Sequence, residues 1–167
     1  MARVDETAFR EFATAAGPPL FRSAWLLTGD WHHAEDLVQD TLARMFRMWS
    51  GIGRIDNPAA YAQTVLARQF LSQRRRRSSS ERPTADLPDT VMAGPDADLR
   101  LALVAALAQL PARDRAVVVL RYLADRSVED VALDLGRSPS AIKIQSMRAL
   151  AKLRATLGAD LLDFVEH

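Results

Sequence analysis

Residues 127–154 read SVEDVALDLGRSPSAIKIQSMRALAKLR, and this stretch predicts two short helices joined by a tight turn. Ser127 is a favourable N-cap, and Asp130, three residues later, approximates a capping box with Asp in place of Glu. Gly136 suits the left-handed position that ends a helix, and Ser138–Pro139 can cap and begin the next one. A capped helix, a glycine turn and a second capped helix form the geometry of a bihelical DNA reader, the helix-turn-helix.

The second helix of this pair has an apolar side and a basic side. Its apolar side carries Ile142, Ala149, Leu153 and Leu157, with Ser146 among them. Residues 137–154 include five basic residues and no acidic one, so the helix can neutralise phosphates while its first half reaches base edges. A plain helical hairpin with a basic face is the alternative, and the capping, the turn and the charge asymmetry together favour the DNA reader.

Ile144 and Met147 fall on the side of this helix that faces away from its apolar stripe. Apolar side chains at these positions could contact the methyl groups of thymine in the major groove. They could equally pack against another domain or a partner protein. The sequence leaves both interpretations open.

The bulk composition is that of a globular protein in a reducing compartment. Of the 167 residues, 49% are hydrophobic and 26% are charged, and the absence of cysteine excludes disulfides and thiolate metal sites. No apolar run approaches the roughly 18 residues that a bilayer requires, and the first 22 residues lack the apolar core of a signal peptide. We therefore expect a cytoplasmic protein with no membrane insertion.

The net charge of +1 conceals three blocks of different sign. Residues 1–77 carry 11 basic and 8 acidic residues (net +3), residues 78–98 one basic and five acidic (net −4), and residues 99–167 ten and eight (net +2). The middle block has three prolines, a glycine and a serine run, without helical or strand periodicity. We therefore expect an acidic linker at 78–98 between two domains, 1–77 and 99–167.

Both flanking blocks show helical periodicity without an alternating strand pattern. They predict an all-α fold of two small helical domains joined by a flexible linker. The run Gly17–Pro18–Pro19 predicts a break between two short helices, and Pro58 suits a first helical position. The expected helices are 6–16, 20–27, 32–48 and 58–77, then 99–110 and 113–122, followed by the helix-turn-helix of about 127–154.

The first domain contains the run AEDLVQDTL at 34–42, whose polar residues form an acidic, hydrogen-bonding face opposite the apolar ones. This motif, followed by Met45, Phe46 and Trp49, resembles the second conserved region of the extracytoplasmic-function (ECF) sigma factors of bacterial RNA polymerase. The resemblance continues in order over about 140 residues, through a loop, a helix ending in the arginine run 74–77, a linker, Leu110–Pro111 with Arg115, and the closing RALAKLR of the helix-turn-helix. The tandem arginines are similar to the actinobacterial SigE-like branch.

The resemblance implies a subunit that binds core RNA polymerase and directs promoter-specific initiation at −35 and −10 elements. The residues implied to dock on the polymerase clamp are Glu35, Asp36, Gln39, Asp40 and Arg44. The loop 51–57 would capture an unstacked base of the −10 element and the next helix would lie along its duplex, through Ile52, Arg54, Asp56, Asn57, Tyr61, Arg68, Arg74, Arg75, Arg76 and Arg77. The −35 element would be read by Arg137, Ser138, Ser140, Lys143, Ile144, Met147, Arg148 and Lys152. The acidic linker would thread the polymerase cleft.

Three positions depart from the family pattern. Arg68 and Ser72 stand where relatives often have Asn and Asp, and Ile144 stands where many have Ser. These departures fall on promoter-facing positions, so the exact promoter sequence stays open. The sequence does not decide whether an anti-sigma factor is a further partner, or whether the tail 160–167 packs on the second domain or binds a regulator.

Other chemistries and other functions are less well supported. His32 and His33 lie beside acidic residues, but adjacent positions point to different sides of a helix, so we expect no metal site and no cofactor. No nucleophile–base pair and no paired carboxylates suggest an enzyme.

Two alternatives to the sigma factor remain: a stand-alone helix-turn-helix regulator that acts without polymerase, and an interaction module such as an anti-sigma decoy. The arginine run 74–77 could be a solvated helix end, but adjacent like charges repel without a counter-surface, which favours phosphate binding.

Overall fold

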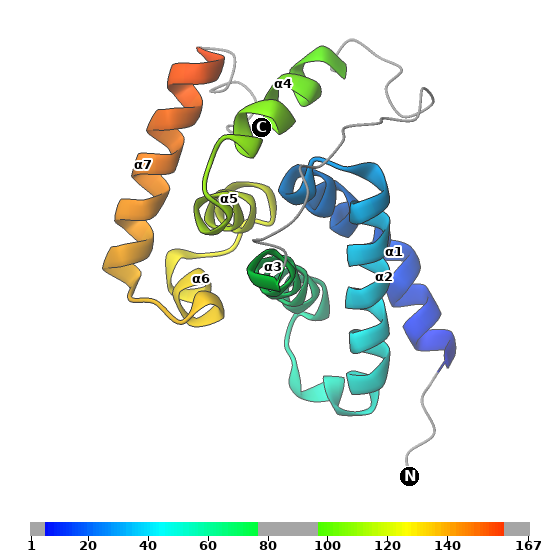
Figure 1. Ribbon diagram of the computed structural model, residues 1–167. Coiled ribbons are helices and arrows are strands. Elements are labelled where there is room, and N and C mark those ends of the chain that lie inside the picture. Colours follow the sequence, from blue (N-terminus) through cyan, green and yellow to red (C-terminus); the bar gives the residue numbers. More distant parts are fainter. Residues whose placement is uncertain (1–5, 77–96, 159–167) are drawn as a thin grey trace.

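The computed structural model describes residues 6–76 and 97–158, apart from the side chains of residues 52–54. Every element in these ranges is helical, which confirms the prediction of an all-α fold (Figure 1). The elements are α1 (Glu6–Thr28), α2 (Trp31–Met48), the 3-10 helix η1 (Trp49–Arg54), α3 (Pro58–Arg76), α4 (Ala97–Ala108), α5 (Ala112–Val118), the π-helical turn η2 (Val119–Leu123), α6 (Val128–Leu135) and α7 (Pro139–Leu157). We call residues 6–76 the N-terminal bundle and residues 97–158 the C-terminal bundle.

Parts of the predicted organisation fall outside the described residues. Of the predicted linker 78–98, the structure describes only Ala97 and Asp98, which lie in the first turn of α4. The predicted contact Arg77 and the tail 160–167 also lie outside the described residues.

Helix α1 runs without a break through the Gly-Pro-Pro run at 17–19, so the predicted interruption is wrong. A proline inside a helix removes the hydrogen bond to the carbonyl four residues earlier. Those carbonyls belong here to Thr14 and Ala15, which lie on the exposed side, where water can satisfy them. Ala16 and Leu20 are buried on either side of the prolines, so tertiary packing outweighs local propensity in this helix.

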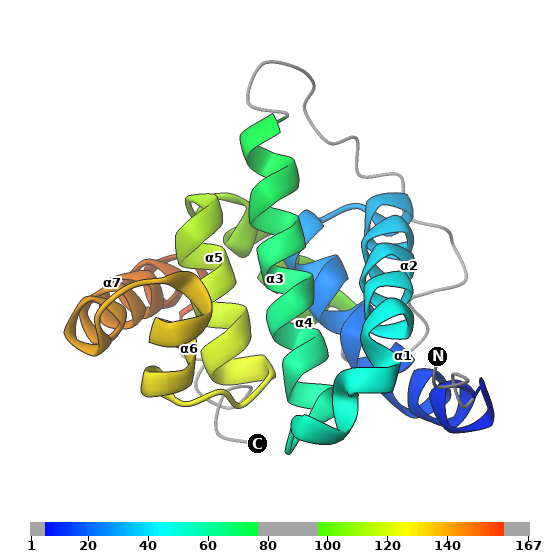
Figure 2. The same ribbon diagram turned by 90° about the horizontal axis from the view of Figure 1, so that it is seen from below.

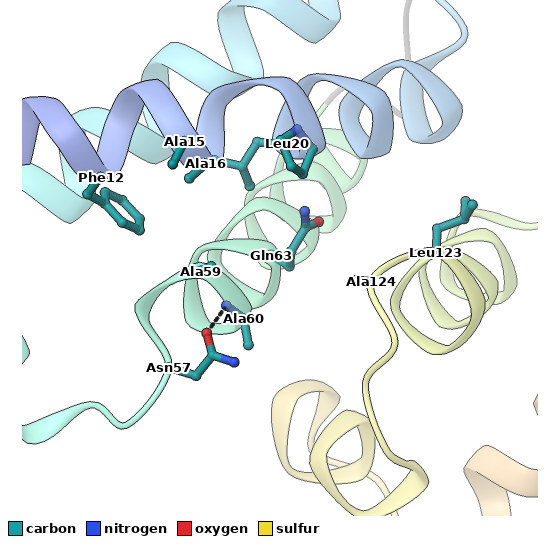
Figure 3. Close-up of a pocket in the computed structure, with 11 residues that line it drawn as sticks. Phe12, Ala15, Ala16, Leu20, Asn57, Ala59, Ala60, Gln63, Leu123 and Ala124 are labelled. Atoms are coloured by element: carbon teal, nitrogen blue, oxygen red, sulfur yellow. Dashed lines mark hydrogen bonds between the residues drawn. The ribbon is translucent and has the colours of Figure 1, made fainter.

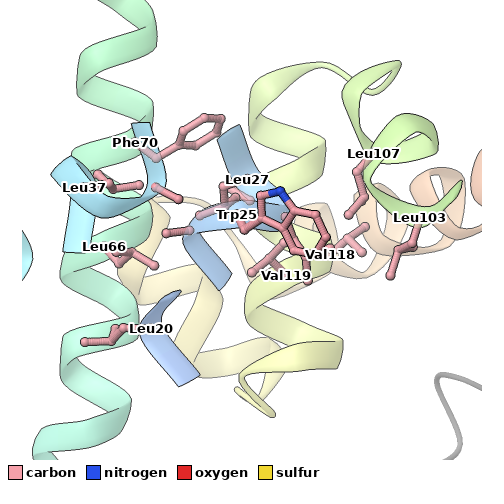
Figure 4. Close-up of a cluster of buried hydrophobic side chains, with 14 of the residues drawn as sticks. Leu20, Trp25, Leu27, Leu37, Leu66, Phe70, Leu103, Leu107, Val118 and Val119 are labelled. Carbon is pink, nitrogen blue, oxygen red and sulfur yellow. The ribbon is translucent and has the colours of Figure 1, made fainter. Parts of the chain in front are cut away.

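The two bundles share one hydrophobic core. Leu20 of α1 and Leu66 of α3 belong to the same cluster of buried side chains as Leu103 and Leu107 of α4. Figure 4 shows these side chains converging from both bundles, with Trp25 of α1 among them. Burial of apolar area from both sides stabilises the contact between the bundles.

Helix α3 lies between α1 and α2 on one side and the C-terminal bundle on the other (Figure 2). It contacts α1 and α2, and also α5, η2 and α6. The six consecutive residues 62–67 are consequently all buried. A helix that packs on one side only keeps a solvated face, so α3 has two packed sides in its middle.

The helix-turn-helix forms with the predicted caps. The side-chain oxygens of Ser127 and Ser138 accept hydrogen bonds from the backbone N–H groups three residues on, at 3.0 and 3.1 Å. Gly136 has a φ of +66°, and the backbone N–H of Arg137 donates to the carbonyl of Ala132 at 2.9 Å. This is a Schellman motif, which satisfies the last carbonyls of α6 and turns the chain into α7. The predicted pair of capped helices, α6 and α7, is therefore confirmed.

A second, smaller cluster forms the core of the helix-turn-helix. It is composed of the buried residues Val117, Leu120, Val131, Ala132, Ile142 and Ala67. Because Ala67 belongs to α3, the N-terminal bundle contributes to the core of the helix-turn-helix as well.

Candidate nucleic-acid interface

The outer face of α7 presents the predicted −35 contacts to solvent. All eight are exposed: Arg137, Ser138, Ser140, Lys143, Ile144, Met147, Arg148 and Lys152. Ile144 and Met147 remain 51% and 71% exposed, so the described part of the chain does not cover them. The opposite side of α7 is buried through Ile142, Ser146, Ala149 and Leu153, as the spacing predicts. The helix therefore offers a basic, partly apolar surface to another molecule.

Two hydrogen bonds connect this surface to α5. The guanidinium of Arg137 donates through Nη1 to Oε1 of Gln145 at 2.9 Å, and Nε2 of Gln145 donates to the carboxylate of Asp114 at 2.7 Å. Sequence reasoning missed Gln145, because an uncharged residue at the edge of an apolar stripe gives no signal of its own. The hydrogen bond that connects Gln145 to α5 depends on Asp114, which the fold brings beside it.

The predicted −10 contacts on α3 lie in two environments. Arg74, Arg75 and Arg76 are exposed at the end of the helix. Arg68 has an exposed side chain, but its Nε donates to the backbone carbonyl of Asp134 in α6 at 2.8 Å. Tyr61 near the start of α3 is half-buried. The structure therefore leaves the end of α3 accessible and covers its middle.

Asp134 of α6 accepts hydrogen bonds from several side chains where the helix-turn-helix meets α3. The guanidinium of Arg126 donates through Nη2 to Oδ1 of this carboxylate at 2.9 Å and through Nε to Oδ2 at 3.1 Å, which is a bidentate ion pair. Thr64 of α3 donates its hydroxyl to the same carboxylate at 2.8 Å and is 1% exposed. Together with the bond from Arg68, this makes Asp134 a polar junction between the helix-turn-helix and α3.

The loop before α3 adjoins a pocket between the bundles. Its Ile52 and Arg54 have side chains outside the described residues, whereas Asp56 and Asn57 are exposed. Asn57 Oδ1 accepts a hydrogen bond from the backbone N–H of Ala60 at 3.1 Å and so caps α3. A pocket of about 330 Å³ lies beside this cap, between α1, the start of α3 and the end of η2 (Figure 3). Gln63 also lines it, and its buried Oε1 has no hydrogen-bond partner among the residues that the structure describes.

The outer face of α2 carries the predicted docking residues. Glu35, Asp36, Gln39, Asp40 and Arg44 are all exposed. The indole N–H of Trp31 donates to Glu35 at 2.6 Å, and Gln73 of α3 donates to Asp40 at 3.4 Å. The face is thus a mostly acidic surface on the side of the molecule opposite α7 (Figures 1 and 2).

Arg115 is a buried cation where the two bundles meet. Its guanidinium donates to the carbonyl of Leu27 at the end of α1 at 2.6 Å and to the carbonyl of Leu110 at 3.0 Å, and it lies over the ring of Phe70 at 5.6 Å. Burial, together with the charge of Arg74, lowers the pKa of Arg115 to about 10, so it stays charged at neutral pH. Arg115 therefore joins α1 and α3 to the start of the C-terminal bundle.

Family models match both bundles. Residues 12–80 match Sigma-70 region 2, and residues 100–153 match Sigma-70 region 4. The second match covers α4 to most of α7, including the whole turn of the helix-turn-helix. Within residues 6–76 and 97–158, none of the helices has the length and apolar character needed to cross a membrane.

Relatives resemble the chain over nearly its full length. The RNA polymerase sigma-E factor of Streptomyces avermitilis is 35% identical over 98% of this chain and 92% of the relative. The ECF RNA polymerase sigma factor SigL of Mycobacterium tuberculosis is 35% identical over 94% of this chain and 96% of the relative. Among solved structures, the sigma factor RpoE of Bartonella quintana, crystallised with the anti-sigma factor NepR, has a TM-score of 0.74 at 27% identity and covers 92% of this chain and 98% of its own.

These matches confirm the family that the run at 34–42 and the helix-turn-helix suggested. They also agree with the prediction of a non-enzymatic protein, since sigma factors supply promoter recognition and not catalysis. The chain belongs to the sigma-70 family, in its ECF group, whose members direct promoter recognition by RNA polymerase.

Proposed function

We propose that this chain binds core RNA polymerase through the outer face of α2 and reads promoter DNA through α7 and the segment from residue 51 to the arginine run 74–77. One observation supports this assignment above the others: the chain exposes an acidic helix face and a basic helix face on separate bundles. Because α2 and α7 lie on opposite sides of the molecule, the polymerase and the −35 duplex can bind simultaneously (Figure 1).

The proposed docking face on α2 consists of Glu35, Asp36, Gln39, Asp40 and Arg44. Side chains at these spacings share one side of a helix, and all five are exposed. Exposed carboxylates give orientation and partner selection to an interface, since a basic surface attracts them and an acidic one repels them. We propose core polymerase as the partner of this face, because the chain belongs to a family whose members direct promoter recognition by RNA polymerase.

The proposed −35 reader is α7. Lys143, Met147 and Arg148 are exposed on its first three turns, which is the part of a recognition helix that enters the major groove. Basic side chains there supply phosphate and guanine contacts, and Ile144 with Met147 supplies apolar contacts to thymine methyls. The acid-free run 137–154 lets the helix approach a polyanion without local repulsion.

The proposed −10 reader requires a change of arrangement. The middle of α3 is covered by the C-terminal bundle, and Arg68 donates to α6, so duplex DNA has no access to that face. We therefore propose that binding to polymerase separates α3 from α6 and frees Arg68 for the promoter. The exposed Arg74 and Arg76 at the end of the helix need no such change to bind phosphate.

The proposed setting is the cytoplasm, where RNA polymerase acts. An anti-sigma factor is a proposed further partner, supported by the complex of the Bartonella relative with NepR. Co-purification of the chain from its native cell would identify such a partner.

Run-off transcription with core polymerase and genomic promoter templates tests the proposal. The wild-type chain should yield promoter-specific transcripts and a stable complex with core enzyme. A double variant, Asp36→Arg with Asp40→Arg, should lose both, while the matched control Glu11→Arg, an exposed acid on α1, should retain both. Operator binding by the chain alone without promoter-specific transcripts would indicate the stand-alone regulator instead. Full core binding by the double variant would refute the docking face.

A further inference from the structure

The hydrogen bonds from Arg137 to Gln145 and from Gln145 to Asp114 form a directed chain. A guanidinium has only donors and an ionised carboxylate has only acceptors, so the amide of Gln145 can satisfy both neighbours in one orientation only. Its oxygen accepts from Arg137 at 2.9 Å, and its nitrogen donates to Asp114 at 2.7 Å. The orientation of this amide is therefore fixed by the chemistry of its two partners.

Gln145 thereby restrains the guanidinium of Arg137, whose backbone is already held by a hydrogen bond of the turn. The backbone N–H of Arg137 donates to the carbonyl of Ala132 within the Schellman turn. At the other end of the same residue, the guanidinium is held against the flank of α7 by Gln145. An arginine side chain has several rotatable bonds, and holding them before binding removes part of the entropy cost of a contact.

The neutral amide also preserves the charge of Arg137. A carboxylate bonded directly to the guanidinium would occupy its fork and compete with phosphate. Asp114 acts through Gln145 instead, and this contact uses one of the five N–H donors of the guanidinium. The remaining donors stay available on an exposed side chain at the start of the recognition helix.

We propose that Gln145 is a positioning residue that presents Arg137 to a DNA phosphate beside the −35 element, with Asp114 as its anchor on α5. This inference rests on the proposed function, because it takes Arg137 as a phosphate contact. It assigns a role to two residues, Gln145 and Asp114, that do not themselves touch DNA. If Gln145 only linked α5 to α7, it would stabilise the fold. The effect of its substitution on DNA binding would then not depend on Arg137.

The test compares five forms of the full chain in complex with core polymerase: wild type, Gln145→Met, Asp114→Ala, Arg137→Ala and the double variant of Gln145→Met with Arg137→Ala. Methionine keeps the length of Gln145 and removes both hydrogen bonds. The measured quantity is the Kd for the promoter fragment found by run-off transcription, over a series of salt concentrations. Thermal unfolding of each free chain serves as the control for folding.

Arg137→Ala should lower the slope of log Kd against log salt by about 1, as expected when one phosphate is no longer neutralised. Gln145→Met should weaken binding by about threefold to tenfold with an unchanged Tm, and Asp114→Ala should have a smaller effect in the same direction. In the Arg137→Ala background, Gln145→Met should have no further effect, because its role is exerted through Arg137.

Two results would overturn the positioning role. One is unweakened binding by Gln145→Met, and the other is an equal loss of affinity from Gln145→Met in the presence and absence of Arg137. A different result would instead refute the phosphate contact in the proposed function: Arg137→Ala with unchanged affinity and unchanged salt slope. The two failures are therefore distinguishable in one experiment.

Discussion

Helices α3 and α7 are both 19 residues long and both carry predicted DNA contacts, yet they differ in how much of each helix is exposed to solvent. In α7 every predicted contact is exposed. In α3 the residues 62–67 are all buried, and Arg68 hydrogen-bonds the C-terminal bundle. Of two helices predicted to contact DNA, one is thus exposed and the other is covered in its middle, according to the elements that pack on each.

The difference follows from the side chains around each helix. In α7 the buried residues recur at spacings of three and four, so they form a single stripe and the opposite face stays in water. In the middle of α3, the small residues Ala62 and Ala67 flank Val65 and Leu66, which allows close packing on two sides. Such a helix must lose one packing partner before duplex DNA can lie along it.

The largest expected effect comes from locking α3 to α6. Thr64 and Asp134 are in contact, and the chain has no cysteine, so Thr64→Cys with Asp134→Cys allows a specific cross-link. Joined by a short bis-methanethiosulfonate reagent that reductant cleaves, this variant should lose promoter-specific transcription completely and regain it after reduction. Run-off transcription before and after reductant measures the effect.

Each single-cysteine variant, treated with the same reagent, is the control for labelling alone. Mass spectrometry of the intact chain establishes the extent of cross-linking. Full transcription by the cross-linked chain would show that α3 serves the promoter without leaving α6, and the contrast between the two helices would then have no functional meaning.

A second prediction concerns the core that the two bundles share. Leu107 of α4 is completely buried in it, and all three tryptophans, Trp25, Trp31 and Trp49, belong to the N-terminal bundle. Leu107→Ala should lower the free energy of unfolding by about 2–5 kcal/mol. Because the core is shared, tryptophan fluorescence in urea should report this destabilisation from the other bundle, in a single transition.

The matched control for this core substitution is Leu133→Ala, since Leu133 is 78% exposed. Its effect should stay within about 0.5 kcal/mol. An unchanged tryptophan transition in Leu107→Ala would mean that the bundles unfold independently and that α3 is not held by a common core.

Features set by neighbouring residues were predictable from the sequence. The caps of α6 and α7 depend on Ser127, Gly136 and Ser138, whose partners lie within a few positions along the chain. The exposed faces of α2 and α7 followed from helical periodicity alone. Local signals failed in α1, where the prolines at 17–19 predicted a break that tertiary packing overrides.

Features set by distant residues were not predictable. The bond from Arg68 to Asp134 spans 66 positions, and that from Gln145 to Asp114 spans 31. The sequence gives the side chains that can bond but not the pairs that the fold brings together. The sequence therefore predicts a DNA contact for Arg68 but not its hydrogen bond to Asp134, and it predicts no role for Gln145.

A third prediction tests the exposed helix. Lys143→Ala and Arg148→Ala should each weaken use of the −35 element by about 1–3 kcal/mol for every base that the side chain no longer recognises. Arg154→Ala removes an exposed positive charge near the end of the same helix and serves as the control. Competition between promoters with intact and altered −35 elements measures the effect, and equal weakening in all three variants would indicate a merely electrostatic role for α7.

The smallest expected effect comes from one hydroxyl of the covered helix. Thr64→Val keeps the shape of a side chain that is 1% exposed and removes its bond to Asp134, while Arg126 still pairs with that carboxylate. This substitution should weaken the packing of α3 on α6 by about 0.5–1.5 kcal/mol, which shifts the equilibrium toward separation by up to roughly tenfold. The distance between spin labels at Ala43→Cys on α2 and Ala155→Cys on α7, both exposed, reports that shift. An unchanged distance distribution would assign the covering of α3 to the apolar core alone, because the polar junction would then contribute too little to move the equilibrium.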